Sequence, residues 1–275
     1  DLVLYGSVSP TNGVYYPFVV ARNLTVVAGG AITDSSSYDP SAYISVTGGT
    51  ASFTAGSTND VILDNYYNQW NTIAFPSARN AQAGSYYTNI NLGTSTMAGT
   101  LYLYGHNSYS LTQTSGSTIT TGSTTTFSNF NNITLAETAN VFGPLAIIGG
   151  NAWGTYNIRE NDAITQASAW SIPNNYVFLT TSGNQAITLS QGSNQLRYLT
   201  LTQASTTDTT TASAGAVNVV TTGYSLNQNS AWTTRGSTTI NASGNTLYLN
   251  GAINTLGPLQ ILGGGNTYIT AKDWT

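Results

Sequence analysis

Apolar and polar residues alternate along the chain in short runs, which are separated by corners rich in Asn, Gly and Ser. The clearest stretch spans residues 132–150, where Ile133 and Leu135 alternate with polar residues before Asn140, and a second apolar run follows. Alternation with a period of two is typical of a strand with one buried face, and Asn favours corners. This stretch therefore predicts a strand, a corner and a second strand.

The same pattern occurs four times, with its first apolar residue at positions 61, 133, 187 and 247, so the steps between copies are 72, 54 and 60. A weaker fifth copy opens the chain at Leu2. Each copy holds a Leu and, five positions later, a corner Asn: Leu63 and Asn68, Leu135 and Asn140, Leu189 and Asn194, Leu249 and Asn254. A repeat with a period near 60 and no break in composition predicts a single domain over residues 1–275.

Each period contains too many short strands for a single hairpin, so we expect the chain to wind. Three coils of about 18–20 residues would fill an ordinary period, each adding one rung to parallel sheets. Such coils stack roughly 4.8 Å apart, which places equivalent residues on top of one another. The predicted fold class is all-β, a right-handed parallel β-helix. The four leucines would point inward, and the four asparagines, three coils apart, would mark one corner without forming a direct ladder.

A shorter motif recurs between the copies of the main pattern. It places Gln or Asp two positions after an apolar residue, at Asp34, Gln113, Gln166 and Gln228. Two other segments, residues 76–89 and 204–215, lack an inward apolar alternation and consist mainly of small and polar residues. We expect both segments to protrude from the coil as loops. The alternative is that they are long corners.

Composition restricts the partners that this chain can have. Only 16 of its 275 residues are charged, 10 acidic and 6 basic, which gives a net charge of −4. No basic stripe is present to bind a nucleic-acid backbone, and no run of about 18 apolar residues predicts membrane insertion. Cysteine is absent, which excludes disulfides and thiolate metal sites and is compatible with an exported chain.

The chain resembles the repeat region of the filamentous haemagglutinin family, large bacterial exoproteins that are exported by two-partner secretion. The stretches that carry the resemblance are residues 133–145, 23–35 and 183–189. The resemblance implies a right-handed parallel β-helix at the cell surface that serves as a shaft or an adhesive. The Asn-Pro-Asn signature of that family's secretion domain is not found here, since residues 9–13 read Ser-Pro-Thr-Asn-Gly.

Catalytic chemistry finds little support in the sequence. A carbohydrate-cleaving β-helix needs clustered carboxylates, and the densest candidate is residues 159–162, where Glu160 and Asp162 would share one face of a strand. His106 is the only histidine, and we interpret it as a surface polar residue. No ligand spacing predicts a metal site or a cofactor site. We therefore expect no enzymatic activity.

Aromatic residues are the better candidates for binding. Trp170 and Trp232 occupy equivalent places, six residues after the apolar residue of the Gln motif, and two pairs lie at a corner or in the predicted loop: Tyr66-Tyr67 and Tyr86-Tyr87. Exposed aromatic rings can stack on sugars at a cell surface or pack against another subunit. The alternative is that these rings stack on one another between coils.

The two chain ends carry no sequence that predicts a cap, since the last copy begins at position 247 and the first near position 2. Open solenoid ends present unpaired backbone groups, so we expect copies to self-associate end to end. The predicted function is an extracellular structural β-solenoid, either a subunit of a stacked surface fibre or a shaft segment of a large adhesin. The alternative function is a carbohydrate-binding or carbohydrate-cleaving β-helix.

Overall fold

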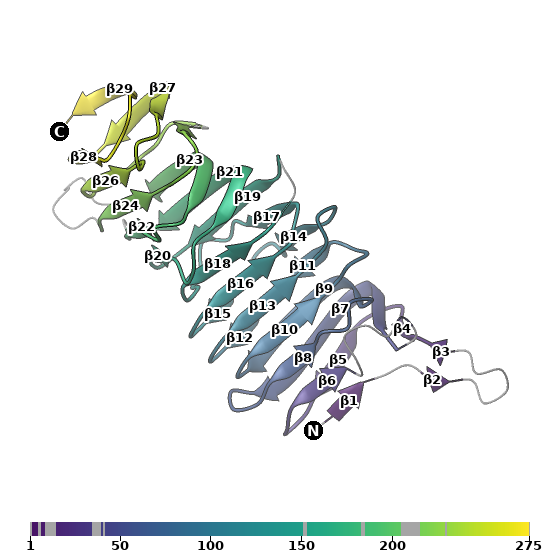
Figure 1. Ribbon diagram of the computed structural model, residues 1–275. Helices are drawn as coiled ribbons and strands as arrows, with labels where there is room; N and C mark the ends of the chain where they lie inside the picture. The colour runs from purple at the N-terminus through teal and green to yellow at the C-terminus, as the bar shows by residue number, and fades with distance from the viewer. Residues whose placement is uncertain are drawn as a thin grey trace. The chain divides into compact units, whose positions relative to one another are not determined.

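The computed structural model describes residues 2–4, 7–8, 15–34, 40, 42–150, 153–182, 185–204, 215–228 and 230–274. In these residues all regular elements are β-strands, nearly all paired in parallel (Figure 1). The chain divides into two compact units, Asp1–Asn132 and Ile133–Thr275. Each unit is a parallel β-solenoid, which confirms the predicted fold class. The described residues contain no helix that is long and apolar enough to cross a membrane.

The first unit winds between two parallel sheets. One sheet has the strand order β1 (Leu2–Leu4), β6 (Ile32–Asp34), β8 (Val61–Leu63), β10 (Ala81–Gly84), β13 (Leu101–Tyr104) and β16 (Thr125–Ser128). In the other sheet, β7 (Ile44–Gly56) pairs with β4 (Phe18–Val20), β5 (Leu24–Val27) and β9 (Gln69–Ala78). Strand β9 also pairs with β11 (Ile90–Leu92) and β12 (Ser95–Met97), which continue to β14 (Ser110–Gln113) and β15 (Ile119–Thr121). A short antiparallel pair, β2 (Ser7–Val8) and β3 (Tyr15–Tyr16), accompanies this unit.

The second unit also has two parallel sheets. The longer one runs β17 (Asn132–Leu135, which begins at the last residue of the first unit), β19 (Thr155–Glu160), β21 (Ser171–Ser182), β23 (Gln195–Ala204), β25 (Leu226–Gln228), β27 (Leu247–Leu256) and β29 (Thr267–Trp274). The shorter one runs β20 (Ile164–Thr165), β22 (Ile187–Leu189), β24 (Val217–Val220), β26 (Thr238–Asn241) and β28 (Leu259–Leu262). In strand β18 (Leu145–Ile148), Leu145 forms an isolated parallel β-bridge with Gln166.

Alternating residues fill the core of each unit, as the sequence pattern predicts. Leu63, Leu135, Leu189 and Leu249 are all completely buried. Around them lie buried aromatic rings, such as Phe53, which packs edge-on against Trp70 with 5.9 Å between ring centroids. Because successive coils place apolar residues on apolar residues, each coil buries the core face of its neighbour.

Some coils are longer than the sequence predicts. Val61, Ala81 and Leu101 are register partners in β8, β10 and β13. The number of residues from one partner to the next equals the longest coil that the sequence predicts. The next partner of Leu101 is Thr125, so this coil exceeds the prediction. The difference arises at the corners, whose length varies because no inward alternation constrains it.

The predicted loop at residues 76–89 is wrong for most of its length. Its first residues complete β9, and β10 follows at Ala81–Gly84, in register with both β8 and β13. The inward positions of β10 are Ala81 and Ala83, which are buried but contribute a weak hydrophobic signal because the side chains are small. Residues 85–89 form the corner before β11. Of the second predicted loop, at residues 204–215, positions 205–214 lie outside the described residues.

Candidate functional site

The corner asparagines bind successive coils together. The side chain of Asn194 is fully buried, and its Oδ1 accepts a hydrogen bond from the backbone N–H of Trp170 in the preceding coil (2.9 Å). Its Nδ2 donates to the carbonyl of Leu189 in its own coil (3.1 Å) and to the carbonyl of Val220 in the next coil (3.1 Å). One amide therefore satisfies backbone groups from three consecutive coils, which no apolar residue could do.

The other corners use the same arrangement. Asn254 accepts from Trp232 N (2.8 Å) and donates to the carbonyl of Leu249 (2.8 Å), and Asn68 accepts from Ile44 N (2.8 Å) and donates to the carbonyl of Leu63 (3.3 Å). Asn140 is also fully buried and donates to the carbonyl of Arg159 (3.3 Å). The contacts run to the backbone of neighbouring coils, so these asparagines act as brackets between coils.

The short Gln motif forms the second half of this bracket. Gln166 exchanges two hydrogen bonds with Asn194, both 2.9 Å, and Gln228 does the same with Asn254, at 2.8 and 3.3 Å. The two motifs are separate in sequence, but the winding places each Gln one coil before its Asn. A pair of side-chain amides can satisfy each other in this way, because each carries both a donor and an acceptor.

Asp34 takes the place of the Gln in the first unit. Its Oδ2 accepts hydrogen bonds from Asn68 Nδ2 (2.6 Å) and from the backbone N–H of Asn65 (2.9 Å). Burial raises the pKa of Asp34 from 3.8 to about 6, and these hydrogen bonds oppose the rise. A carboxylate can only accept, so this bracket lacks the reciprocal hydrogen bond of the Gln–Asn pairs.

The tryptophans that the sequence suggested as binding residues lie inside the protein. Trp170 and Trp232 are both 0 % exposed, and their indole N–H groups donate to the carbonyls of Leu145 (3.2 Å) and Leu199 (2.7 Å). Their equivalent spacing reflects a shared place in the core, next to the Asn brackets. The prediction of exposed rings at these two positions is therefore wrong, because the coil turns their side chains inward.

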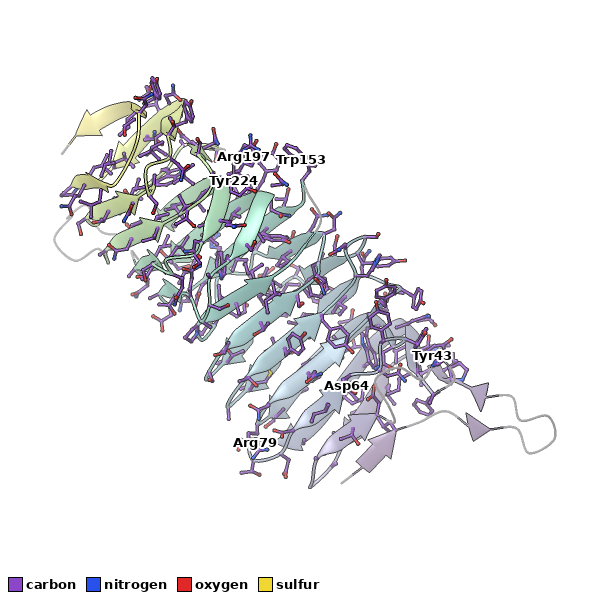
Figure 2. The ribbon with its side chains drawn as sticks, in the orientation of Figure 1. Tyr43, Asp64, Arg79, Trp153, Arg197 and Tyr224 are labelled. Carbon is purple, nitrogen blue, oxygen red and sulfur yellow. The ribbon has the colours of Figure 1, made fainter. Side chains whose placement is uncertain are left out.

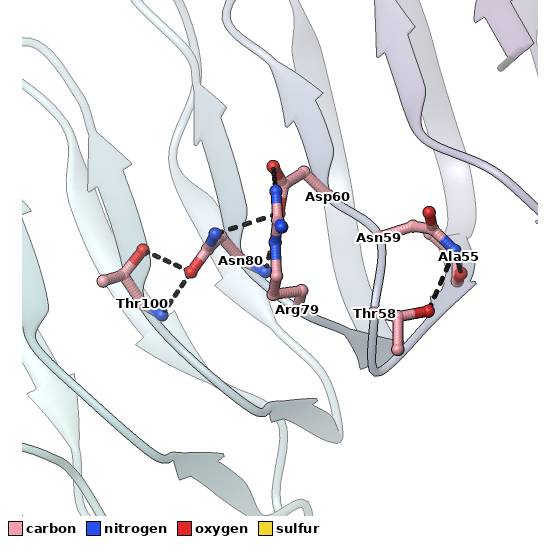
Figure 3. A network of polar contacts seen from close by, with 7 residues as sticks. All are labelled: Ala55, Thr58, Asn59, Asp60, Arg79, Asn80 and Thr100. Carbon is pink, nitrogen blue, oxygen red and sulfur yellow. Dashed lines mark hydrogen bonds and ion pairs between the residues drawn. The ribbon is translucent and has the colours of Figure 1, made fainter.

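A side-chain ladder connects three corners of the first unit. Arg79 forms an ion pair with Asp60, with 2.6 Å between Nη2 and Oδ2, and the backbone N–H and side-chain amide of Asn80 donate to Asp60 Oδ1 (Figure 3). Asn80 Oδ1 in turn accepts from the N–H and hydroxyl of Thr100. The hydrogen bonds from Arg79, above all, lower the pKa of Asp60. These corners form a structural ladder of polar residues at positions 60, 80 and 100, and Arg79 adds an ion pair to it.

An aromatic ladder with the same spacing lies at another corner of the first unit. The rings of Tyr66 and Tyr86 are in contact, with 3.9 Å between centroids and an angle of 32° between their planes. The rings of Tyr86 and His106 are also in contact, at 4.1 Å and 58°. Beside it, Tyr67 stacks on Tyr87 at 5.6 Å, and the Tyr87 side chain is 45 % exposed. The tyrosine rings therefore contact one another between coils, and they also contribute to a surface.

The aromatic ladder forms one wall of a pocket. The pocket has a volume of about 450 Å³ and lies over the outer face of β8, β10 and β13, where Asp64 marks its position in Figure 2. Its lining consists of Asp64, Tyr66, Gln82, Tyr86, Tyr102, Tyr104, Gly105, His106, Asn107 and Asn129. Pockets of small-molecule sites have comparable volumes and combine aromatic walls with a few polar groups.

Gly84 leaves the space that the ring of Tyr104 occupies beside the pocket. The ring of Tyr104 lies directly over Gly84, so that a Cβ added there would collide with the ring carbons. From this position the hydroxyl of Tyr104 donates to the backbone carbonyl of Asp64, two coils away. The absence of a side chain at position 84 thus allows Tyr104 to span the sheet.

The carboxylates at positions 160 and 162 do not form an acid–base pair. Glu160 is completely buried and accepts a hydrogen bond from Phe142 N (2.9 Å), whereas Asp162 is exposed. Burial raises the pKa of Glu160 to about 8, and the charge of Asp162 adds to the rise. A substrate could not reach Glu160. Within the described residues, no group of three potential His, Asp or Glu ligands could hold a metal ion.

A second aromatic group lies on the second unit. Trp153 is 60 % exposed and adopts a left-handed backbone with φ of 77°. Its ring lies 6.4 Å from that of Tyr176 and 6.2 Å from that of Tyr198, and the guanidinium of Arg197 lies 5.1 Å from the Tyr198 ring centroid (Figure 2). The group is an exposed aromatic surface.

The sequence predicts part of the pocket of the first unit. Of the four predicted tyrosines, Tyr66 and Tyr86 line it, whereas Tyr67 and Tyr87 lie beside it. His106, interpreted from the sequence as a surface polar residue, is also part of the lining, and the remaining lining residues were not predicted. The missing signal is the constant spacing between coils, which aligns positions 66, 86 and 106 and also 64, 84 and 104.

The fold and the repeated brackets define a repeat β-solenoid protein. Residues 16–75, 78–149 and 143–202 match the family described as repeats of unknown function (DUF5649). The matches cover more than half of the chain, which therefore belongs to this family. Each match ends on one copy of the strand–corner–strand pattern. No curated protein and no solved structure matches the chain.

Proposed function

We propose that this chain is a structural β-solenoid module of a bacterial surface protein, serving as a segment of a shaft or fibre and not as an enzyme. The observation that carries the proposal is the Asn bracket. In both units a fully buried Asn joins the backbones of neighbouring coils. The buried polar groups are thus used to hold coil on coil, which is what a shaft under tension requires.

Two further features support this role. The chain has only 16 charged residues, so stacked coils bring few like charges together. The stretches at residues 23–35 and 133–145 resemble the repeats of filamentous haemagglutinin, whose shaft lies outside the cell. On this proposal the module is exported, and its copies associate end to end in a fibre or continue into further repeats of a longer chain.

Surface labelling tests the location. Antibodies raised against the purified chain should label intact cells of the source bacterium without permeabilisation. Labelling only after permeabilisation would contradict the proposal.

A second measurement tests the assembly. In sedimentation velocity, end-to-end association predicts an average mass that rises with concentration, and electron microscopy of the same samples should show rods of increasing length. A chain that stays monomeric at all concentrations would exclude the self-assembling fibre and leave the shaft segment.

A further inference from the structure

We propose that the pocket of the first unit binds a neutral oligosaccharide, without cleaving it. This inference goes beyond the shaft role, because a shaft needs no pocket. It rests on three properties of the lining: exposed aromatic surface, polar side chains that the protein leaves unused, and very little charge.

The aromatic surface comes from two directions. Tyr66, Tyr86 and His106 form the aromatic ladder at the corner, and Tyr102 and Tyr104 project from β13 with 5.7 Å between their ring centroids. All five side chains are only partly buried. Aromatic faces pack well against the C–H faces of sugar rings, because the ring offers a large apolar area while its hydroxyl stays available for hydrogen bonds.

Polar side chains complete the lining. Among the described residues, no side-chain hydrogen bond engages Gln82, Tyr86, Tyr102 or Asn129, although all four line the pocket. These groups offer donors and acceptors at several points of the cavity, which matches the hydroxyl groups of a sugar. Because all four side chains are at least partly exposed, water satisfies these groups in the free protein, and the hydroxyl groups of a sugar can replace that water.

The low charge of the pocket lining favours neutral sugars over acidic ones. Asp64 is the only carboxylate among the lining residues, and no Lys or Arg is present. An acidic sugar would meet the Asp64 carboxylate without a Lys or Arg to pair with its own charge, so neutral sugars fit better. Glycoside hydrolysis needs two carboxyl groups flanking the scissile bond. The lining supplies one, so the site should bind a sugar without cleaving it.

The site is preorganised. Tyr104 is held over Gly84 by its hydrogen bond to the carbonyl of Asp64, and each ladder ring is held by its neighbours in adjacent coils. A ligand would therefore bind without ordering loose side chains, which removes one of the main costs of association.

Calorimetry on the full chain tests this inference. The probes are maltohexaose, cellohexaose, mannohexaose and the hexamer of N-acetylglucosamine, with hexagalacturonate as the acidic comparison. We expect at least one neutral probe to bind, hexagalacturonate to bind at least tenfold more weakly, and the reducing-end content of the mixture to stay constant. Lack of binding by all neutral probes at about 10 mM, a concentration that detects millimolar Kd values, would overturn the inference, as would hydrolysis.

Matched variants locate the binding. Tyr86→Ala should lower the affinity about tenfold or more, the loss expected for one aromatic contact. Gln82→Ala and Tyr102→Phe should each lower it severalfold with unchanged thermal unfolding, because neither side-chain group is hydrogen-bonded to a residue that the structure describes. The control is Tyr248→Ala, which removes a half-exposed ring stacked on Tyr268 at 5.3 Å outside the pocket.

The outcomes separate the possibilities. Losses at the pocket variants with an unchanged control support the inference. Equal losses at Tyr86 and Tyr248, or binding that no pocket variant weakens, would overturn it. So would a Tyr86→Ala variant that only abolishes self-association, since the ladder would then be a subunit contact. None of these results decides the shaft role, which the surface labelling tests separately.

Discussion

Replacement of Asn194 by Ala should destabilise the second unit more than most single substitutions of a polar residue. The side chain accepts one hydrogen bond from Trp170 N and donates to the carbonyls of Leu189 and Val220, all within 3.1 Å, and it is fully buried. Truncation would leave a buried N–H and two buried carbonyls without these partners. An unsatisfied buried group costs about 1–3 kcal/mol, so we expect a loss of about 3–5 kcal/mol after partial relaxation.

Asn194→Asp provides a sharper version of the same test. The carboxylate keeps the acceptor for Trp170 but loses both donors and adds a buried charge. This variant should be at least as unstable as Asn194→Ala at neutral pH. It should recover part of its stability in acid, where the side chain is protonated and can donate once.

Urea unfolding followed by circular dichroism and by tryptophan fluorescence measures both effects. The matched control is Asn218→Ala, at an outward-facing position of β24 in the same unit, which should change the free energy of unfolding by no more than about 0.5 kcal/mol. A cost below about 1 kcal/mol for Asn194→Ala, or a cost equal to that of the control, would refute the bracket as the interaction that holds the coils together.

Three further predictions concern the core, the register and a buried carboxyl. Leu135→Ala should cost about 2–5 kcal/mol in urea unfolding, as other large-to-small changes at fully buried sites do, and a near-zero cost would mean that this coil is not packed. Cysteines introduced together at Thr96 and Thr120, register partners in β12 and β15, should form a disulfide on mild oxidation, seen as a faster band on a non-reducing gel, whereas the pair at Thr96 and Thr126 should not. The pKa of Glu160 rises from 4.5 to about 8 on folding, so the folded chain holds a proton that the unfolded chain has released, and its stability should fall as the pH rises through this window. In Glu160→Gln the free energy of unfolding should decrease by several kcal/mol less over the same pH range, because each unit of pKa difference is worth about 1.4 kcal/mol. Equal pH dependence of the variant and the original chain would contradict the assignment.

The fold class could be predicted from the sequence because period-two alternation acts within each strand. Leu135 and Leu189 needed no tertiary information to be placed inward, since a polar Thr separates each of them from the preceding apolar residue and so fixes the buried face. The recurrence of Asn five positions after these leucines also marked one corner correctly, because each repeat uses the same backbone turn and the same buried amide.

The arrangement between coils could not be predicted in this way. Residues at corners have no periodicity that fixes their direction, so the inward turn of Trp170 and Trp232 depends on the corner conformation. The pairing of Gln166 with Asn194, and the ring contacts of Tyr86 with Tyr66 and His106, depend on how many residues each coil contains. Alternation is a local property of the chain, whereas coil length depends on the corners, whose length no alternation fixes. For this reason the sequence determined the solenoid and its core, and only the tertiary structure brought the lining of the pocket together.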